Sequence, residues 1–186
     1  FHGQLGPGQK MNGSPTGSIP VLGGYLSDAI DTYGANNTII ALPGDMTGAS
    51  PAESNLLLDE PAILFFNRFV TGDWKKPDTT ETTGVRVIGT LGNHEFDRNI
   101  SELQRLMKGG NDGTNITHLV DPYPGALWPV VAANVFWNGT DDLFLEPYSI
   151  EDIGGIPVAF IGAVTELTGE ISEPDDVEPV TFTDEA

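Results

Sequence analysis

The sequence predicts an α/β fold with a mixed sheet, and two observations support this prediction. In the first two-thirds of the chain, apolar β-branched runs typical of buried strands alternate with segments whose apolar residues recur at helical spacing. Two further β-runs, residues 144–152 and 156–164, are joined at Gly154-Gly155, where a hairpin turn is expected. Helices between strands favour parallel pairing, and the hairpin adds an antiparallel pair.

The first half of the chain contains its predicted elements in the order that such a fold requires. Residues 3–18 are rich in Gly, Pro, Ser and Asn, which indicates a loop. A helix is expected over residues 19–33, followed by a strand over residues 38–42. A second helix should begin at Glu60-Pro61, because proline is tolerated in the first turn of a helix.

The second half follows from the same signals. A buried strand begins at Val85, and residues 99–108 form a short amphipathic helix. Another strand is expected over residues 128–135, before the hairpin. An acidic loop at residues 170–176 then precedes a last element that begins near residue 179.

Length and composition limit the possible functions. The 186 residues fit one domain or most of one, with surface insertions expected near residues 71–83 and 111–127. The net charge of −19 repels nucleic-acid backbones, so no nucleic-acid polymer is expected as a partner; a small anionic substrate is compatible if divalent cations reverse the local field. The sequence contains no cysteine, so a metal site would need oxygen and nitrogen ligands. No apolar run approaches the length of a transmembrane segment.

Polar side chains follow the ends of two of the predicted strands. Gly44 and Asp45 come after the strand at residues 38–42, and the hexapeptide GNHEFD at residues 92–97 comes after the strand that begins at Val85. An α/β sheet presents its functional groups at the carboxyl ends of its strands. The two segments are therefore expected to form one site.

Each of these residues also has a plain structural interpretation. Asp45 fits a turn aspartate after a glycine, and Asn93 fits a residue that caps the next helix. Glu95 is expected to cap or pack rather than to react. His118 matches no motif and is expected at the surface, whereas Trp128 is expected in the core or at its rim.

Three pieces of the chain, Phe1-His2-Gly3, Gly44-Asp45 and the hexapeptide 92–97, resemble the signature of calcineurin-like metallophosphoesterases, which runs D-x-H, then G-D, then G-N-H-D/E. The hexapeptide resembles in particular the 5′-nucleotidase and 2′,3′-cyclic-nucleotide phosphodiesterase branch. Further segments resemble that branch as well: residues 23–26, 129–135 and 154–162. The resemblance therefore covers nearly the whole chain.

The resemblance implies a four-layer αββα sandwich with two mixed sheets between helices. Residues 1–186 would be the N-terminal metallophosphoesterase domain, incomplete at both ends: the aspartate of D-x-H would precede Phe1, and no histidine follows His118 to match the family's later G-H-x-H. A C-terminal nucleoside-binding domain is expected outside these residues. The family is largely extracytoplasmic, which implies a secreted, periplasmic or cell-surface location.

The resemblance also implies a role for each of five residues. His2 would bind a first metal ion, Asp45 would bridge two ions, and Asn93 would bind the second through its amide oxygen. His94 would be the catalytic histidine, which contacts the phosphoryl group or the leaving oxygen without binding metal, and Asp97 would orient it. The cofactors would be two divalent ions, with Mn, Zn, Mg, Fe and Ca all suited to such ligands.

The function that follows from the resemblance is a hydrolase that removes phosphate from nucleotides, as 5′-nucleotidases do, by an in-line attack of water activated between two metal ions. One alternative is a cyclic-nucleotide or sugar-nucleotide phosphodiesterase that uses the same site. Another is a noncatalytic cell-surface binding protein that retains the fold. The spacing of Asp45, Asn93, His94 and Asp97 favours an enzyme, since a binding protein has no need of it.

Overall fold

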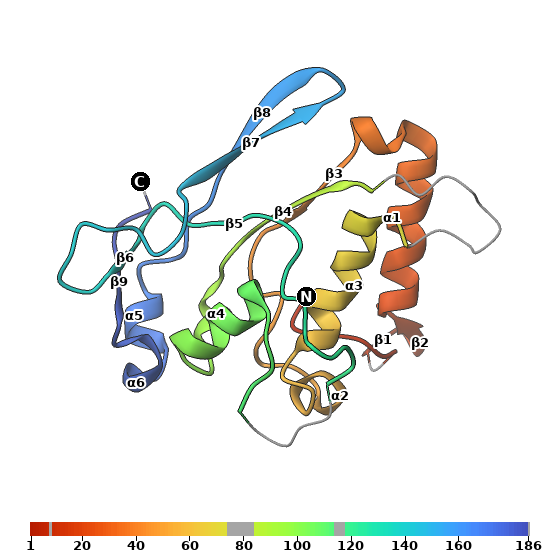
Figure 1. Ribbon diagram of the computed structural model, residues 1–186. Coiled ribbons are helices and arrows are strands. Elements are labelled where there is room, and N and C mark those ends of the chain that lie inside the picture. The colour runs from red at the N-terminus through yellow and green to blue at the C-terminus, as the bar shows by residue number, and fades with distance from the viewer. Residues whose placement is uncertain (8, 74–83, 114–117, 186) are drawn as a thin grey trace.

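The computed structural model describes residues 1–7, 9–73, 84–113 and 118–185 (Figure 1). Its helices are α1 (Ile19–Tyr33), α2 (Ala52–Asn55), α3 (Glu60–Thr71), α4 (Ile100–Lys108), α5 (Thr168–Ile171) and α6 (Pro174–Val177), with two 3₁₀ turns, η1 (Ala35–Asn37) and η2 (Asn93–Phe96). Its strands are β1 (Gln9–Met11), β2 (Ser14–Thr16), β3 (Ile39–Leu42), β4 (Arg86–Thr90), β5 (Val130–Val131), β6 (Val135–Trp137), β7 (Tyr148–Ile153), β8 (Ile156–Ile161) and β9 (Val180–Phe182). Most of the insertion expected near residues 71–83 lies outside the described residues.

A parallel three-stranded sheet, in the order β3-β4-β5, forms the centre of the molecule. The middle strand β4 is apolar and buried, with Val87 and Ile88 each only 3% exposed. Leu42, the last residue of β3, pairs with Gly89 in β4. Because the two strands are parallel and in this register, the segments that follow them leave the sheet side by side.

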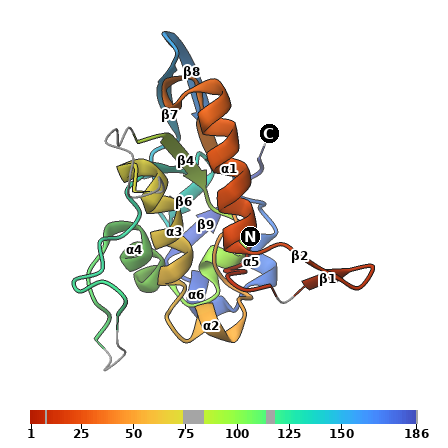
Figure 2. The ribbon, with the colours of Figure 1, turned by 90° about the vertical axis from the view of Figure 1, so that its right-hand side faces the viewer.

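Two helices cover one side of this sheet. Figures 1 and 2 show α1 and α3 side by side, and α1 begins and ends as the sequence predicts. The side chains of Phe66 and Phe69 in α3, each 2% exposed, belong to one hydrophobic cluster with Ile40 of β3 and Val87 of β4. Burying side chains of this size stabilises the fold by about 1.5–3 kcal/mol each, which fixes the sheet and therefore the ends of its strands.

A second hydrophobic cluster lies beneath the turn that follows β4. Phe96, the last residue of η2, is completely buried there and stacks edge-to-face on Phe182 of β9. The cluster also contains Leu103 of α4 and Val135 of β6. Phe96 thus anchors the hexapeptide 92–97 to the core, and the neighbouring side chains of His94 and Asp97 remain partly exposed at the candidate site.

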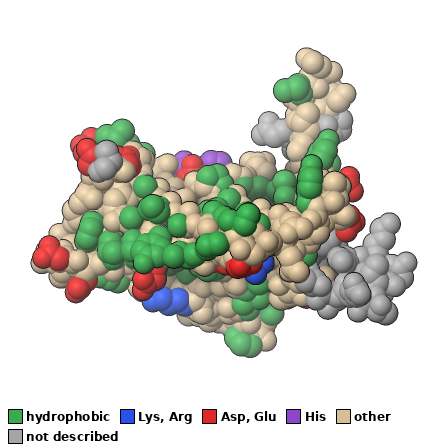
Figure 3. Space-filling view, turned by 90° about the horizontal axis from the view of Figure 1, so that it is seen from above, with side chains coloured by type: hydrophobic (Ala, Val, Ile, Leu, Met, Phe, Trp, Pro, Cys, Tyr) green, Lys and Arg blue, Asp and Glu red, His purple; other side chains and the backbone are tan. Residues whose placement is uncertain are grey.

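The hairpin β7–β8 projects from the top of the molecule in both ribbon views. Its turn contains Gly154 and Gly155, both with positive φ, as the sequence predicts. Several of its apolar side chains are more than half exposed: Tyr148, Ile150, Ile156 and Ile161. The view from above shows hydrophobic side chains gathered in a band on this side of the molecule (Figure 3).

The fold is α/β with parallel and antiparallel pairs, as predicted. Three expectations about single elements are wrong. The loop expected at residues 3–18 contains the hairpin β1–β2, whose tip Asn12-Gly13 has positive φ at both residues. Asn-Gly is a strong hairpin signal, and the composition of the segment obscured it.

The strand expected over residues 128–135 is divided into β5 and β6. Between them the backbone N–H of Ala132 donates to Glu146 O and that of Ala133 donates to Gly162 O, so the chain leaves the parallel sheet and changes partners. The acidic segment at residues 170–176 forms parts of the short helices α5 and α6 rather than a loop. In the described part of the chain, no helix is both long and apolar enough to cross a membrane.

Candidate active site

The two segments that leave β3 and β4 meet backbone to backbone through glycines. A Cβ added to Gly44 would lie 2.5 Å from the backbone nitrogen of Gly92, and a Cβ added to Gly92 would collide with the Asp45 carboxylate. Gly44 also has a φ of 94°, which other residues rarely adopt. The glycine after each strand is therefore required for the close approach of the two loops.

Asp45 lies at the point of contact and is bound on several sides. Its Oδ1 accepts the backbone N–H of His94 at 3.2 Å, and its Oδ2 lies 3.8 Å from His2 Nε2. Its backbone carbonyl accepts the N–H of His2 at 2.8 Å. The φ of Asp45 is 50°, in the left-handed region that non-glycine residues seldom occupy. Such a conformation persists only where the surroundings fix it, and it is common at functional sites.

His2 is oriented by the same loop. Its Nδ1 lies 3.1 Å from the carbonyl oxygen of Gly48, which can only accept a hydrogen bond, so the proton belongs on Nδ1. The Nε2 atom then faces the Asp45 carboxylate. The ring of His2 is 4.9 Å from the ring of His94, edge to face.

His94 is paired with Asp97 three residues later. Its Nδ1 lies 3.1 and 2.9 Å from the two carboxylate oxygens, and the two side chains are 32% and 36% exposed. This hydrogen bond raises the pKa of His94 above its ordinary value, and partial burial opposes the shift. The nearby charges of Asp97, Asp45 and Glu95 act in the same direction as the hydrogen bond.

The structure brings His2, Asp45, His94 and Asp97 together, with Asn93 next to them in the chain. The donor set fits divalent cations in its chemistry, because it combines an imidazole nitrogen, a carboxylate and an amide oxygen. The side chain of Asn93 makes no hydrogen bond within the described residues, so its oxygen can accept another partner. Among those residues, however, no three His, Asp or Glu side chains form a complete metal site. The residues therefore fit as part of a coordination sphere.

Glu95 is the residue whose importance sequence reasoning underestimated. Its carboxylate accepts the backbone N–H groups of Asp45 (2.8 Å), Met46 (2.7 Å) and Thr47 (3.1 Å) from one loop and of Gly92 (2.6 Å) from the other. The expected capping role is confirmed, since the bond to Gly92 N–H caps η2. Burial raises the pKa of Glu95, and the four backbone donors oppose the shift. No local signal in the sequence shows the bonds to residues 45–47.

The expectation that His118 lies at the surface is wrong. Its side chain is only 6% exposed, with Nδ1 2.7 Å from Glu60 Oε1 and Nε2 3.3 Å from Asp112 Oδ1. Glu60 Oε1 also accepts from Arg105 Nη1 at 2.7 Å, and Arg105 lies over the ring of Tyr123. Two described side chains of the insertion expected near residues 111–127, His118 and Tyr123, are therefore buried in the protein rather than exposed at its surface. Trp128 is 7% exposed and belongs to the core, as expected.

No protein-family model matches the chain, but it is similar to relatives that are named as nucleotide enzymes and as a cell-wall protein. It is 37% identical over 150 residues to Endonuclease YhcR of Bacillus subtilis, covering 81% of this chain and 11% of the relative. It is 34% identical over 199 residues to Cell wall protein Lmo0130 of Listeria monocytogenes, covering 100% of this chain and 23% of the relative. It is 32% identical over 105 residues to a 5′-nucleotidase of Vibrio cholerae, covering 54% of this chain and 16% of the relative. The chain spans less than a quarter of each of these relatives.

Solved structures of proteins named as 5′-nucleotidases have a similar fold. A 5′-nucleotidase precursor from Thermus thermophilus superposes with a TM-score of 0.64 at 25% identity, over 99% of this chain and 30% of that one. A putative 5′-nucleotidase from Staphylococcus aureus has the same fold, with a TM-score of 0.64 at 21% identity, over 98% of this chain and 30% of that one. The fold and motifs are those of a calcineurin-like metallophosphoesterase domain. The relatives and solved structures named 5′-nucleotidases are consistent with the resemblance of these motifs to the 5′-nucleotidase branch of that superfamily.

Proposed function

We propose that this chain forms part of a metal-dependent hydrolase that removes phosphate from nucleotides. The observation that supports it most strongly is the position of Asp45. Its two carboxylate oxygens contact the backbone of His94 and face the ring of His2, where the ends of β3 and β4 meet. A relative named 5′-nucleotidase supports nucleotides as the class of substrate.

In this proposal His2 and Asp45 hold one divalent ion, and Asp45 and Asn93 hold a second. When bound, such ions stabilise negative charge on a phosphoryl group and make a bound water acidic enough to act as a nucleophile. Mn, Zn, Mg, Fe and Ca all accept this mixture of oxygen and nitrogen donors. Each ion needs further ligands, because the described residues offer only two of the proposed donors to each.

His94 and Asp97 would act on the substrate itself. Asp97 accepts from Nδ1 of His94 and so fixes the plane of the ring, which leaves Nε2 for the substrate. A proton on Nε2 can be donated to a phosphoryl oxygen or to the leaving oxygen as the ester bond breaks. His94 would therefore affect turnover more than metal binding.

A phosphodiester substrate is the second candidate, and one observation favours it: the Bacillus subtilis relative is named an endonuclease. The same residues could serve a cyclic-nucleotide or sugar-nucleotide diester, since only the leaving group differs. The net charge of −19 opposes a long polyanion and so favours a small diester. We also propose an extracytoplasmic location, in keeping with the relative named as a cell-wall protein.

Exchange of Asp45 tests the proposal. In the whole protein, Asp45→Asn should lower metal occupancy and abolish phosphate release from a nucleoside 5′-monophosphate, while circular dichroism remains that of the folded protein. The matched control is Asp28→Asn, the same chemical change at an exposed position of α1, which should leave turnover unchanged. Unchanged phosphate release in Asp45→Asn would remove Asp45 from the site.

The wild-type protein decides between the candidate functions. Phosphate release from a 5′-monophosphate, compared with opening of a 2′,3′-cyclic nucleotide, gives the preference between monoester and diester. If neither substrate reacts with any of the five metals, the noncatalytic binding protein becomes the better interpretation.

A further inference from the structure

The loop at residues 45–49 is held by carboxylates along its whole length. Its five consecutive backbone N–H groups all donate to carboxylate oxygens: the first three to Glu95, the fourth to Asp59 at 3.3 Å and the fifth to Asp97 at 3.0 Å. Glu95 also accepts from Gly92 N–H, so one side chain connects the loop after β3 with the loop after β4. None of these bonds belongs to regular secondary structure.

The same loop contains the strained residue of the site. Asp45 has a φ of 50° and Ala49 a φ of 46°, both in the left-handed region. A non-glycine residue stays in that region only where its surroundings exclude the relaxed alternatives. For Asp45, the first N–H of the loop is bound to Glu95 Oε2, and the same oxygen is bound to Gly92 N–H.

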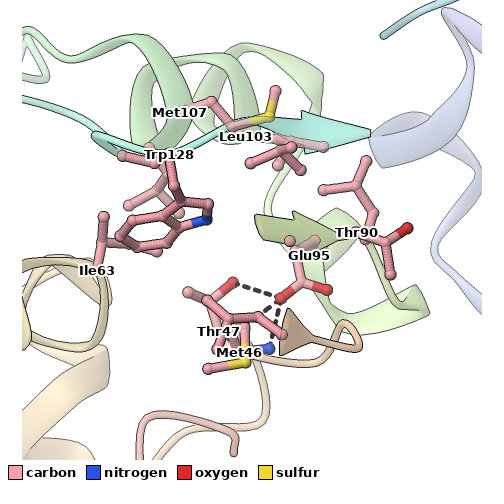
Figure 4. Close-up of a pocket in the computed structure, with 14 residues that line it drawn as sticks. Met46, Thr47, Ile63, Thr90, Glu95, Leu103, Met107 and Trp128 are labelled. Carbon is pink, nitrogen blue, oxygen red and sulfur yellow. Dashed lines mark hydrogen bonds between the residues drawn. The ribbon is translucent and has the colours of Figure 1, made fainter. Parts of the chain in front are cut away.

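The surroundings of Glu95 present hydrogen-bond donors to its carboxylate. All its backbone partners are donors, and the Thr47 hydroxyl, at 3.4 Å from Oε1, is the only further polar contact in the described residues. Beyond the carboxylate lies a cavity of about 30 Å³ with mainly apolar walls that include Leu103, Met107 and Trp128 (Figure 4). A glutamine would place an NH₂ group against these backbone N–H donors.

We propose that Glu95 is the positioning residue of this site, which holds Asp45 in its left-handed conformation and so keeps the Asp45 carboxylate between His2 and His94. Glu95 does not contact substrate or metal in this proposal and acts only through Asp45. The inference rests on the proposed function in one respect, namely that Asp45 is a metal ligand. The hydrogen bonds themselves are independent of that function.

Amide hydrogen exchange tests the holding role without metal. In Glu95→Gln, the amides of residues 45–47 and of Gly92 should exchange at least about tenfold faster than in the wild type, because their acceptor is lost. The matched control is Glu60→Gln, the same change at another buried glutamate, which contacts Arg105 and His118 instead of this loop. Glu60→Gln should lower stability and leave exchange at these four amides unchanged relative to global unfolding. Unchanged exchange in Glu95→Gln overturns the inference.

Metal binding by the whole protein tests the positioning role. Glu95→Gln should weaken Mn²⁺ binding by about 10- to 100-fold, as loss of a residue that orients a ligand does, and saturating Mn²⁺ should restore part of kcat. Glu95→Asp keeps the charge but has a shorter side chain, so its Mn²⁺ affinity should lie between those of the wild type and Glu95→Gln. It replaces Glu95→Gln in the test if that variant does not fold. Faster exchange with wild-type Mn²⁺ affinity overturns the positioning role. Faster exchange in a protein whose wild type binds no Mn²⁺ supports the hold on the loop and refutes the proposed function instead.

Discussion

Two histidine–carboxylate pairs in this molecule differ in how much of the imidazole remains available. His94 and Asp97 are about one-third exposed, and only Nδ1 of the ring is bound within the described residues. His118 and Glu60 are 6% and 1% exposed, and both nitrogens of the ring face carboxylates. An imidazole with both nitrogens committed inside the protein is a structural crosslink, whereas one held by a single nitrogen can offer the other to a substrate.

The comparison also separates two ways of using charge. Around His118, the Arg105 guanidinium binds Glu60 and Glu102 and lies over Tyr123, so these two carboxylates have a cationic partner within the protein. Around His94, no described Lys or Arg side chain forms an ion pair with Asp45 or Glu95, whose carboxylates accept backbone N–H groups. Carboxylates that have no Lys or Arg partner remain able to bind a metal cation, whereas Glu60 and Glu102 are already paired with Arg105.

The largest effect should come from His94→Ala. In the whole protein it should lower kcat by about 10²–10⁴, because the residue acts on the transition state, and metal content and thermal stability should stay near those of the wild type. Steady-state kinetics with metal analysis provides the measurement. Metal loss as large as that of Asp45→Asn would show that His94 is a ligand.

His118→Ala applies the same substitution to the other pair, and its effect should fall on folding. Removing a buried hydrogen-bonding partner is costly, but Glu60 keeps Arg105, so a loss of about 3 kcal/mol is expected. Denaturant unfolding measures this loss, and kcat of the folded variant should be that of the wild type. A stable His118→Ala protein with reduced kcat would break the distinction between the two histidines.

The sequence predicted which residues meet at the site better than it predicted the hydrogen bonds that hold them there. Two strands that each end in a glycine and a polar residue indicated that Asp45 and the hexapeptide would meet, and His94 and Asp97 are three residues apart, so their pairing is local. The metal-binding and catalytic roles stay predictions. Glu95 was harder to place because its partners at residues 45–47 come from another loop, and only the fold brings them within reach.

The burial of His118 could not be predicted for the same reason, because it depends on a contact with a residue distant in the sequence. Its partner Glu60 is 58 residues away, and nothing in the polar sequence around His118 indicates that the segment returns to the core. Composition describes the solvent exposure of a segment on average and cannot identify the one side chain that turns inward. The break between β5 and β6 has a similar cause, since it depends on hydrogen bonds to Glu146 and Gly162, which come later in the chain.

Gly92→Ala tests the close contact between Gly92 and Asp45 at the candidate site. An added Cβ would meet the Asp45 carboxylate and backbone, so we expect a loss of about 2 kcal/mol from overpacking, together with weaker metal binding. Gly24→Ala is the matched control: its Cβ would meet nothing within 4 Å, and in the middle of α1 alanine should instead stabilise by about 0.5–1 kcal/mol. Thermal unfolding of both variants gives the comparison. An unaffected Gly92→Ala protein would mean that the two loops lie farther apart.

The smallest effect should come from Tyr123→Phe, on the structural side of the comparison. The ring is 1% exposed, and its hydroxyl donates to the carbonyl of Leu106 at 3.0 Å. That carbonyl also accepts from Ala126 N–H, so it keeps a partner, and the loss should be about 1 kcal/mol. The phenyl ring still lies under Arg105, so the contacts of His118 with Glu60 and Asp112 should survive, and neither kcat nor metal affinity should change. A loss near 3 kcal/mol in urea unfolding would show that the hydroxyl and the His118 cluster act as one cooperative unit, and a double variant with His118→Ala would then be less destabilised than the sum of the two.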